Sequence, residues 1–296
     1  MMSKIYSEWW HRDANAIKDR ETLEFDNGYE APIIRVNSIH ALNTLVGYCK
    51  HIYESEGHIY FRGQSENYKA VLPSLYRGIT IKKSLNNKKH KLNVLVEQAV
   101  ENNEILKKMD KKLIDPLLQH YGVKTDWLDL VDNLWVALWF TIHDYIRAEN
   151  DIQYEYVTKL RLSHERTYLY LVLADATDKH TKIPGYYKGL KTEIVDLRSA
   201  VPSVFLRPHN QHAILMRKRD VNDPQCADMA EQVKLVIELE PKQVKEWIGS
   251  GRLLSVENIY PSPVNDQGYS ILLKDLIVNK EDGIGSITLI SSESFI

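Results

Sequence analysis

The order of hydrophobic and polar residues predicts a helix and then a strand in the first quarter of the chain. Behind Ser38, a residue type that favours the N-cap, apolar residues recur at spacings of three and four as far as Tyr53, which is typical of a helix. Residues 58–62 then alternate, with Ile59 and Phe61 on one face, and this period of two predicts a strand that ends at Gly63.

The same reading predicts helices and strands along the rest of the chain. Lys82–Lys91 is expected to be an exposed loop or the start of a helix that runs from about Leu92 to Lys108, and Pro116 favours the first turn of a short helix. Asp132 is the expected cap of a deeply packed helix that continues to Ile146. Strands are expected at 167–174, 193–197, 212–216 and 233–239. These elements predict an α+β fold with a mixed central sheet flanked by helices.

Composition narrows the class of protein. The chain has 296 residues, of which 44% are hydrophobic and 26% charged, and this argues against long disorder. A net charge of -2 argues against a basic nucleic-acid platform of whole-domain extent. Two cysteines are too few for a disulfide framework or a cysteine-rich metal site. Because no segment resembles a secretory signal or a membrane span, we expect a soluble, cytoplasmic protein that does not enter a membrane.

Three polar stretches carry the candidate chemistry. In the first, Arg62 ends the predicted strand and offers a rigid fork of donors to phosphate or carboxylate, while Gly63 permits a positive φ and a close ligand approach. Arg77 adds a second guanidinium nearby in the sequence. For both arginines a structural role, as a brace for a turn, is the alternative.

The second stretch runs from Gln119 to Asp129, and the third from Phe205 to Met216. The second crowds polar groups into the approach to a buried helix, so its side chains are expected to bond to one another. No metal is expected there, because no second histidine follows His120 at helical spacing. The third places Gln211 at the end of a predicted strand, where its side chain either faces a pocket or belongs to an ordinary turn. No nucleophile elbow and no phosphate-cradling glycine loop is present in the sequence.

These stretches together resemble the FRG domain family, named after a Phe/Tyr-Arg-Gly triplet. The matching motifs are Phe61-Arg62-Gly63-Gln64, Pro73-Ser74-Leu75-Tyr76-Arg77, Gln119-His120-Tyr121-Gly122, Thr125, Leu128-Asp129 and Ala137-Leu138-Trp139-Phe140. The resemblance predicts a core domain over residues 34–220, an N-terminal extension over 1–33 and a C-terminal α+β addition over 221–296. The chain departs from the family pattern at Asp126, where an arginine is usual, and at Val131, where a threonine is usual.

The order of the motifs is also similar to that of ADP-ribosyltransferases of the Arg-Ser-Glu type. By that resemblance Arg62 holds a phosphate of NAD, Thr125 braces the pocket, and Gln211 stands where the family has a catalytic glutamate. The implied catalytic residues are therefore Arg62, Gln211 and Asp129, with NAD as substrate. The implied ligand-binding residues are Gly63, Gln64, Arg77, His120, Tyr121 and Thr125. Such an enzyme would act as a toxin or an anti-phage effector on a protein target.

Two other functions stay open from the sequence. Since the neutral amide of Gln211 cannot stabilise a developing positive charge as a carboxylate does, the same pocket would suit a module that senses a nucleotide or a polar peptide without chemistry. Alternatively, Lys82–Lys91 and Arg217-Lys218-Arg219 would bind nucleic acid or another protein, although the net charge makes nucleic acid the less favoured partner.

Overall fold

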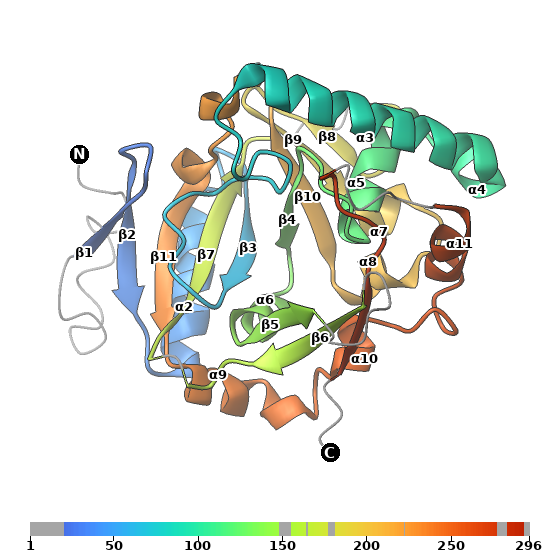
Figure 1. The fold of residues 1–296 in the computed structure, drawn as a ribbon. Coiled ribbons are helices and arrows are strands. Elements are labelled where there is room, and N and C mark those ends of the chain that lie inside the picture. Colours follow the sequence, from blue (N-terminus) through green and yellow to red (C-terminus); the bar gives the residue numbers. More distant parts are fainter. Residues whose placement is uncertain are drawn as a thin grey trace.

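The computed structural model describes residues 21–147, 155–163, 165–176, 181–221, 223–276 and 283–292. Its main feature is a nine-stranded sheet around which the helices are arranged (Figure 1). The strand order is β1-β2-β11-β7-β3-β4-β10-β9-β8. β2 and β11 are parallel, and the other neighbouring pairs are antiparallel. The predicted α+β class with a mixed central sheet flanked by helices is therefore confirmed.

A second, three-stranded sheet has the order β12-β6-β5, and its strands β5 and β6 lie below β4 in the view of Figure 1. The strands are β1 (Glu21–Glu24), β2 (Glu30–Arg35), β3 (His58–Gln64), β4 (Leu128–Val131), β5 (His143–Arg147), β6 (Glu155–Leu160), β7 (Thr167–Ala174), β8 (Tyr186–Lys188), β9 (Thr192–Asp196), β10 (Ala213–Lys218), β11 (Val233–Leu239) and β12 (Leu289–Ser292).

The helices gather around two apolar clusters. One cluster packs α2 and α6 against buried side chains of β3, β7 and β11, and the other surrounds Trp127 with side chains of α3, α5 and α11. The helices are α2 (Ile39–Ile52), α3 (Lys82–Asn102), α4 (Glu104–Lys107), α5 (Ile114–His120), α6 (Leu134–Thr141), α7 (Leu197–Ala200), α8 (Leu206–Asn210), α9 (Pro241–Trp247), α10 (Val256–Ile259) and α11 (Gln267–Asp275). Single 3-10 turns cover Lys111–Leu113, Pro224–Cys226, Ala230–Gln232 and Gly249–Gly251.

The predictions for the helix around residue 134 were wrong at both of its ends. Its N-cap is Asn133, whose Oδ1 accepts from the backbone N–H groups of residues 135 and 136 at 2.9 and 3.3 Å. The carboxylate of Asp132 instead pairs with Arg198 at 2.6 Å. The helix ends at Thr141, and residues 143–147 form β5. The His143 ring meets the carbonyl oxygen of Trp139 at 2.7 Å, so a side chain takes the bond that another helical turn would have made.

The lysine-rich segment Lys82–Lys91 belongs to the helix α3, which begins at Lys82, and the alternative of a loop was wrong. Leu85 supplies the reason, because it is buried on the same face of α3 as Leu92 and Leu95. The predicted strand over 233–239 and the N-cap at Ser38 are confirmed.

The division of the chain into an extension, a core and an addition stays a prediction. β11 follows residue 220 and lies between β2 and β7 within the large sheet. None of the helices in the described residues has the length and apolarity needed to cross a bilayer.

Candidate functional site

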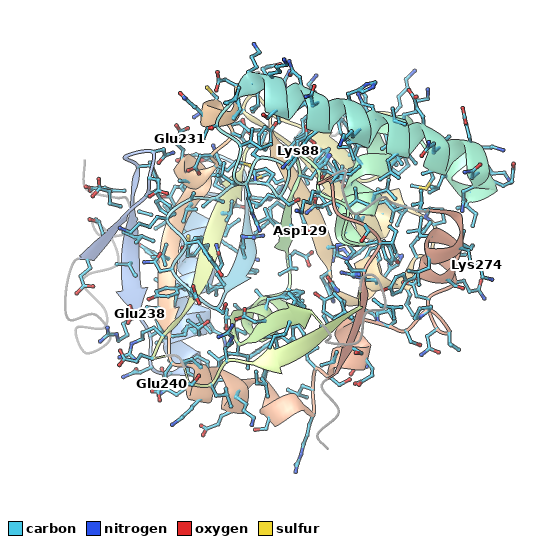
Figure 2. The ribbon with its side chains drawn as sticks, in the orientation of Figure 1. Lys88, Asp129, Glu231, Glu238, Glu240 and Lys274 are labelled. Carbon is cyan, nitrogen blue, oxygen red and sulfur yellow. The ribbon has the colours of Figure 1, made fainter. Side chains whose placement is uncertain are left out.

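A cavity opens where two neighbouring strands of the large sheet separate. β3 pairs with β7 from His58 to Gln64, whereas its register with β4 consists of Phe61 opposite Val131. Beyond Phe61 the two strands diverge, and a cavity of about 660 Å³ is lined by residues of both. Asp129, which Figure 2 labels, comes from the β4 side of this opening.

The cavity collects most of the residues that the sequence singled out. Those that line it are Arg62, Gly63, Gln64, Arg77, His120, Asp129 and Gln211. The three residues expected to be catalytic are therefore in one pocket, although they come from β3, from β4 and from the turn before β10. Tyr121 and Thr125 are fully buried and are not among the residues that line it.

The guanidinium of Arg62 is half-buried in the pocket wall. Its Nη1 donates to the backbone carbonyl of Asp129 at 2.7 Å, on the side where the strands have separated. Burial, together with the neighbouring charge of Arg77, lowers the pKa of Arg62 to about 10. Because burial disfavours its charged form, an anion that entered the pocket would stabilise this arginine.

Gly63 owes its identity to packing. A Cβ atom built at this position would lie 2.1 Å from the carbonyl oxygen of Ala137, in the helix α6 that crosses β3. Gly63 lies in extended backbone and is not one of the glycines with positive φ, so the positive φ that glycine permits is not used here. A glycine is required here because α6 approaches the strand more closely than a side chain would allow.

Gln119 connects the motifs of the sequence. Its Oε1 accepts from the Ser74 hydroxyl at 3.1 Å and from both the N–H and the hydroxyl of Thr125 at 3.0 Å. Its Nε2 donates to Oδ2 of Asp129 at 2.8 Å. One amide therefore fixes the loop that precedes β4 and orients the carboxylate in the pocket. The sequence placed Gln119 in a motif but gave it no role.

His120 and Asp129 form the polar floor of the pocket. Nδ1 of His120 lies 3.9 Å from Oδ1 of Asp129, and Nε2 of His120 is buried without a hydrogen-bond partner among the described residues. Burial lowers the pKa of His120, which its neighbour Asp129 offsets in part. Burial raises the pKa of Asp129, but interactions with His120, Gln119 and Arg62 lower the pKa by more than burial raises it. This carboxylate is therefore ionised at neutral pH. No group of three or more metal-type side chains is arranged around an ion site in the described residues.

Gln211 is held in the pocket wall by its amide nitrogen. Nε2 donates to the carbonyl oxygen of Ile259 at 2.8 Å, and the residue is 4% exposed. The contact crosses 48 residues of sequence, so it ties the end of α8 to the last residue of α10.

Tyr121 and Thr125 hold the motif loop from behind the pocket. The Tyr121 hydroxyl donates to Oδ2 of Asp266 at 2.6 Å, and Oγ1 of Thr125 accepts from the N–H of Trp127 at 3.2 Å. Between them, Gly122 has a φ of +115°, and a Cβ there would lie 2.6 Å from the carbonyl oxygen of Ser286. The C-terminal segment therefore packs on this loop, and Gly122 is the residue that permits it.

One wall of the pocket is aromatic, and the sequence did not predict this wall. Its members are Phe61, Tyr68, Phe140, His143, Tyr145 and Tyr260. The imidazole of His143 stacks on Trp139 with 3.7 Å between ring centroids and 9° between ring planes, and burial lowers its pKa to about 4. The hydroxyls of Tyr145 and Tyr260 are hydrogen-bonded to each other. Residues 143–145 fall within the helix that the sequence predicts up to Ile146, and no motif points to Tyr260.

Asp126, which stands where the FRG family usually has an arginine, lies close to the guanidinium of Arg217. Oδ2 of Asp126 lies 3.6 Å from Arg217, which also pairs with Glu193 at 2.6 Å and stacks on Trp127 at 4.4 Å. Arg217 is thus occupied within the fold. Arg219 lies 3.9 Å from the same Glu193, so the expected basic surface over residues 217–219 has two of its three charges in ion pairs.

The comparisons with known proteins agree with the motifs. Residues 57–150 match the family model described as FRG domain, and this range contains β3, α5, β4 and α6. No curated protein and no solved structure matched the chain. The matched range supplies Arg62, His120 and Asp129 to the pocket, whereas Arg207, Gln211 and Tyr260 come from beyond it. Over residues 57–150 this protein is therefore similar to FRG domains.

Proposed function

We propose that the pocket between β3 and β4 binds a nucleotide that carries phosphate groups, with NAD as the first candidate. The observation that carries this proposal is the state of Arg62. Its guanidinium is half-buried, burial lowers its pKa, and its hydrogen bond among the described residues goes to a backbone carbonyl. The Asp129 carboxylate is near but makes no direct ion pair with it, so the guanidinium can bind a phosphate through two parallel hydrogen bonds.

The aromatic wall supports a nucleotide over a simple anion. The rings of Phe140, His143 and Tyr145 line the same cavity as Arg62. Aromatic faces stack on planar bases, and arginines bind phosphates, so the two kinds of group suit the two ends of a nucleotide. The volume of about 660 Å³ lies within the usual range of ligand pockets.

Thermal unfolding with increasing concentrations of NAD and ADP-ribose tests the binding. A ligand that binds the folded state alone raises the free energy of unfolding by RT ln(1 + [L]/Kd), about 2.7 kcal/mol at a hundredfold excess over Kd. Arg62→Gln is expected to abolish the rise in melting temperature. Arg35→Gln is the matched control, because Arg35 lies exposed at the end of β2 and pairs with Glu238 of β11. No rise with either nucleotide for the unchanged protein would reject the proposal.

A second candidate, ADP-ribosyltransferase-like use of NAD as a substrate, is favoured by Asp129. The lowered pKa of Asp129 keeps a carboxylate ionised inside the pocket. That charge would stabilise an oxocarbenium-like transition state, which the neutral amide of Gln211 cannot do. An effector of the toxin or anti-phage kind would fit this activity. Release of nicotinamide from NAD, lost in Asp129→Asn, is the expected result. Binding of NAD without any release would reject catalysis and leave a nucleotide-sensing module.

A further inference from the structure

Arg207 is a buried cation in the wall of the pocket. It is 6% exposed, and its Nε and Nη1 are shielded from solvent without a hydrogen-bond partner among the described residues. The guanidinium lies 4.5 Å from the ring centroid of Tyr260 and 5.3 Å from that of Tyr121. These two rings hold it in place and leave part of its hydrogen-bonding capacity unused.

Asp266 binds the backbone of Arg207 and not its guanidinium. Oδ2 of Asp266 accepts from the backbone N–H of Arg207 at 2.9 Å and from the Tyr121 hydroxyl at 2.6 Å. Within the described residues, no carboxylate forms an ion pair with the Arg207 guanidinium. A buried charge without a partner is strongly unfavourable, and proteins retain one where a ligand supplies the opposite charge.

His120 adds a second unused polar atom in the same wall. It is also 6% exposed, and its Nε2 has no partner among the described residues. The other ring nitrogen, Nδ1, points to Asp129 and lies 3.9 Å from Oδ1 of that residue. Asp129 in turn accepts from Arg62 through its backbone carbonyl. Arg62, Asp129 and His120 therefore follow one another across the pocket, and the charge of Arg207 lies close enough to His120 to add to the lowering of the imidazole pKa by burial.

We propose that Arg207 and His120 form an inner phosphoryl subsite, distinct from the one at Arg62. Because the Asp129 carboxylate between them repels anions, one phosphoryl group cannot occupy both positions. The pocket then takes a ligand with two linked phosphoryl groups, a nucleoside diphosphate or a dinucleotide, one group on each side of Asp129. This inference rests on the proposed function, which it deepens by naming the class of nucleotide.

The alternative for Arg207 is a structural brace between two tyrosines. Arg207→Met separates the two roles, since methionine keeps the apolar stem and removes the charge. If the arginine serves a ligand, the unliganded variant keeps or gains melting temperature, because an unpaired buried charge has been removed. If it is a brace, the melting temperature falls.

Calorimetric titration of ADP, AMP and inorganic pyrophosphate tests the subsite. The unchanged protein is expected to bind ADP about tenfold more tightly than AMP, because one more phosphoryl group is bound by charge-assisted hydrogen bonds. Arg207→Met is expected to weaken ADP by about 10- to 100-fold and to bring it level with AMP. Arg35→Gln should preserve both affinities. His120→Gln, which changes the same subsite, replaces Arg207→Met if that variant does not fold.

The outcomes distinguish this inference from the proposed function. Equal affinities for ADP and AMP in the unchanged protein, or a preference for ADP that survives in Arg207→Met, would overturn the subsite while nucleotide binding stands. Pyrophosphate binding that depends on Arg207, without binding of any nucleotide, would support the subsite and reject the nucleotide. Binding of none of the three would overturn both.

Discussion

Replacing Gln119 with leucine removes four hydrogen bonds that join the polar motifs to the pocket. Three of them end on Oε1, from the Ser74 hydroxyl and from the N–H and hydroxyl of Thr125, and the fourth runs from Nε2 to Asp129. Leucine has a similar size and no polar atoms. The variant therefore tests whether this amide stabilises the loop or merely lies beside it.

The magnitude follows from what each partner loses. Thr125 is fully buried, so its N–H would be left without a partner, which costs about 1–3 kcal/mol. The Asp129 side chain is 46% exposed, so water would replace most of its lost bond, and we assign about 1 kcal/mol. The two hydroxyls together add about 1 kcal/mol. The expected loss in the free energy of unfolding is about 3–5 kcal/mol.

Urea denaturation at pH 7 measures this loss as a change in midpoint at constant slope. Ser74→Ala serves as the control, because it removes one of the four bonds at a half-buried position and should cost about 0.5–1 kcal/mol. A loss below about 1 kcal/mol for Gln119→Leu would show that the loop is held by apolar packing and would refute the reasoning.

Three further predictions concern stability. Gly63→Ala is expected to lower the free energy of unfolding by about 3 kcal/mol, because its Cβ would overlap a carbonyl oxygen of α6. Gly47→Ala, in an open position of α2, should raise the free energy of unfolding by about 0.5–1 kcal/mol, and urea denaturation measures both. The pKa of His143 is about 4 in the folded protein and 6.5 ordinarily. The contribution of the neutral imidazole to the free energy of unfolding is therefore complete above pH 6.5 and is lost as the pH falls through 4. That contribution is up to about 3 kcal/mol, and His143→Gln should flatten the pH dependence of the melting temperature. Gln119→Glu would place two carboxylates where 2.8 Å now separates Gln119 from Asp129, so the pair should keep a proton and lose stability as the pH rises. An unchanged pH profile for either variant would contradict its prediction.

Local patterns made several elements predictable. The Ser38 cap, the alternation around Ile59 and the apolar run of β7 each act within a few residues, and the structure has all three. The motifs also predicted that Arg62 and Asp129 belong to one site, and in the structure Arg62 donates to the backbone carbonyl of Asp129.

What the sequence could not supply depends on contacts between distant segments. Residues 143–147 continue a helical pattern, yet they pair with β6 as a strand. Arg207 resembled any other turn residue until its neighbours were known, because the rings of Tyr121 and Tyr260 approach it from 86 residues before and 53 residues after. The requirement for glycine at residue 63 likewise comes from a helix that begins 71 positions later.

Binding of a nucleotide by Arg62 in the opening between β3 and β4 can be observed directly. A crystal structure of the protein soaked with ADP-ribose tests it most directly. We expect a phosphoryl oxygen about 3 Å from the Arg62 guanidinium, with an aromatic ring of the wall stacked on the adenine. Well-ordered crystals in which this pocket stays empty at saturating ADP-ribose, or in which the ligand lies elsewhere on the surface, would contradict it.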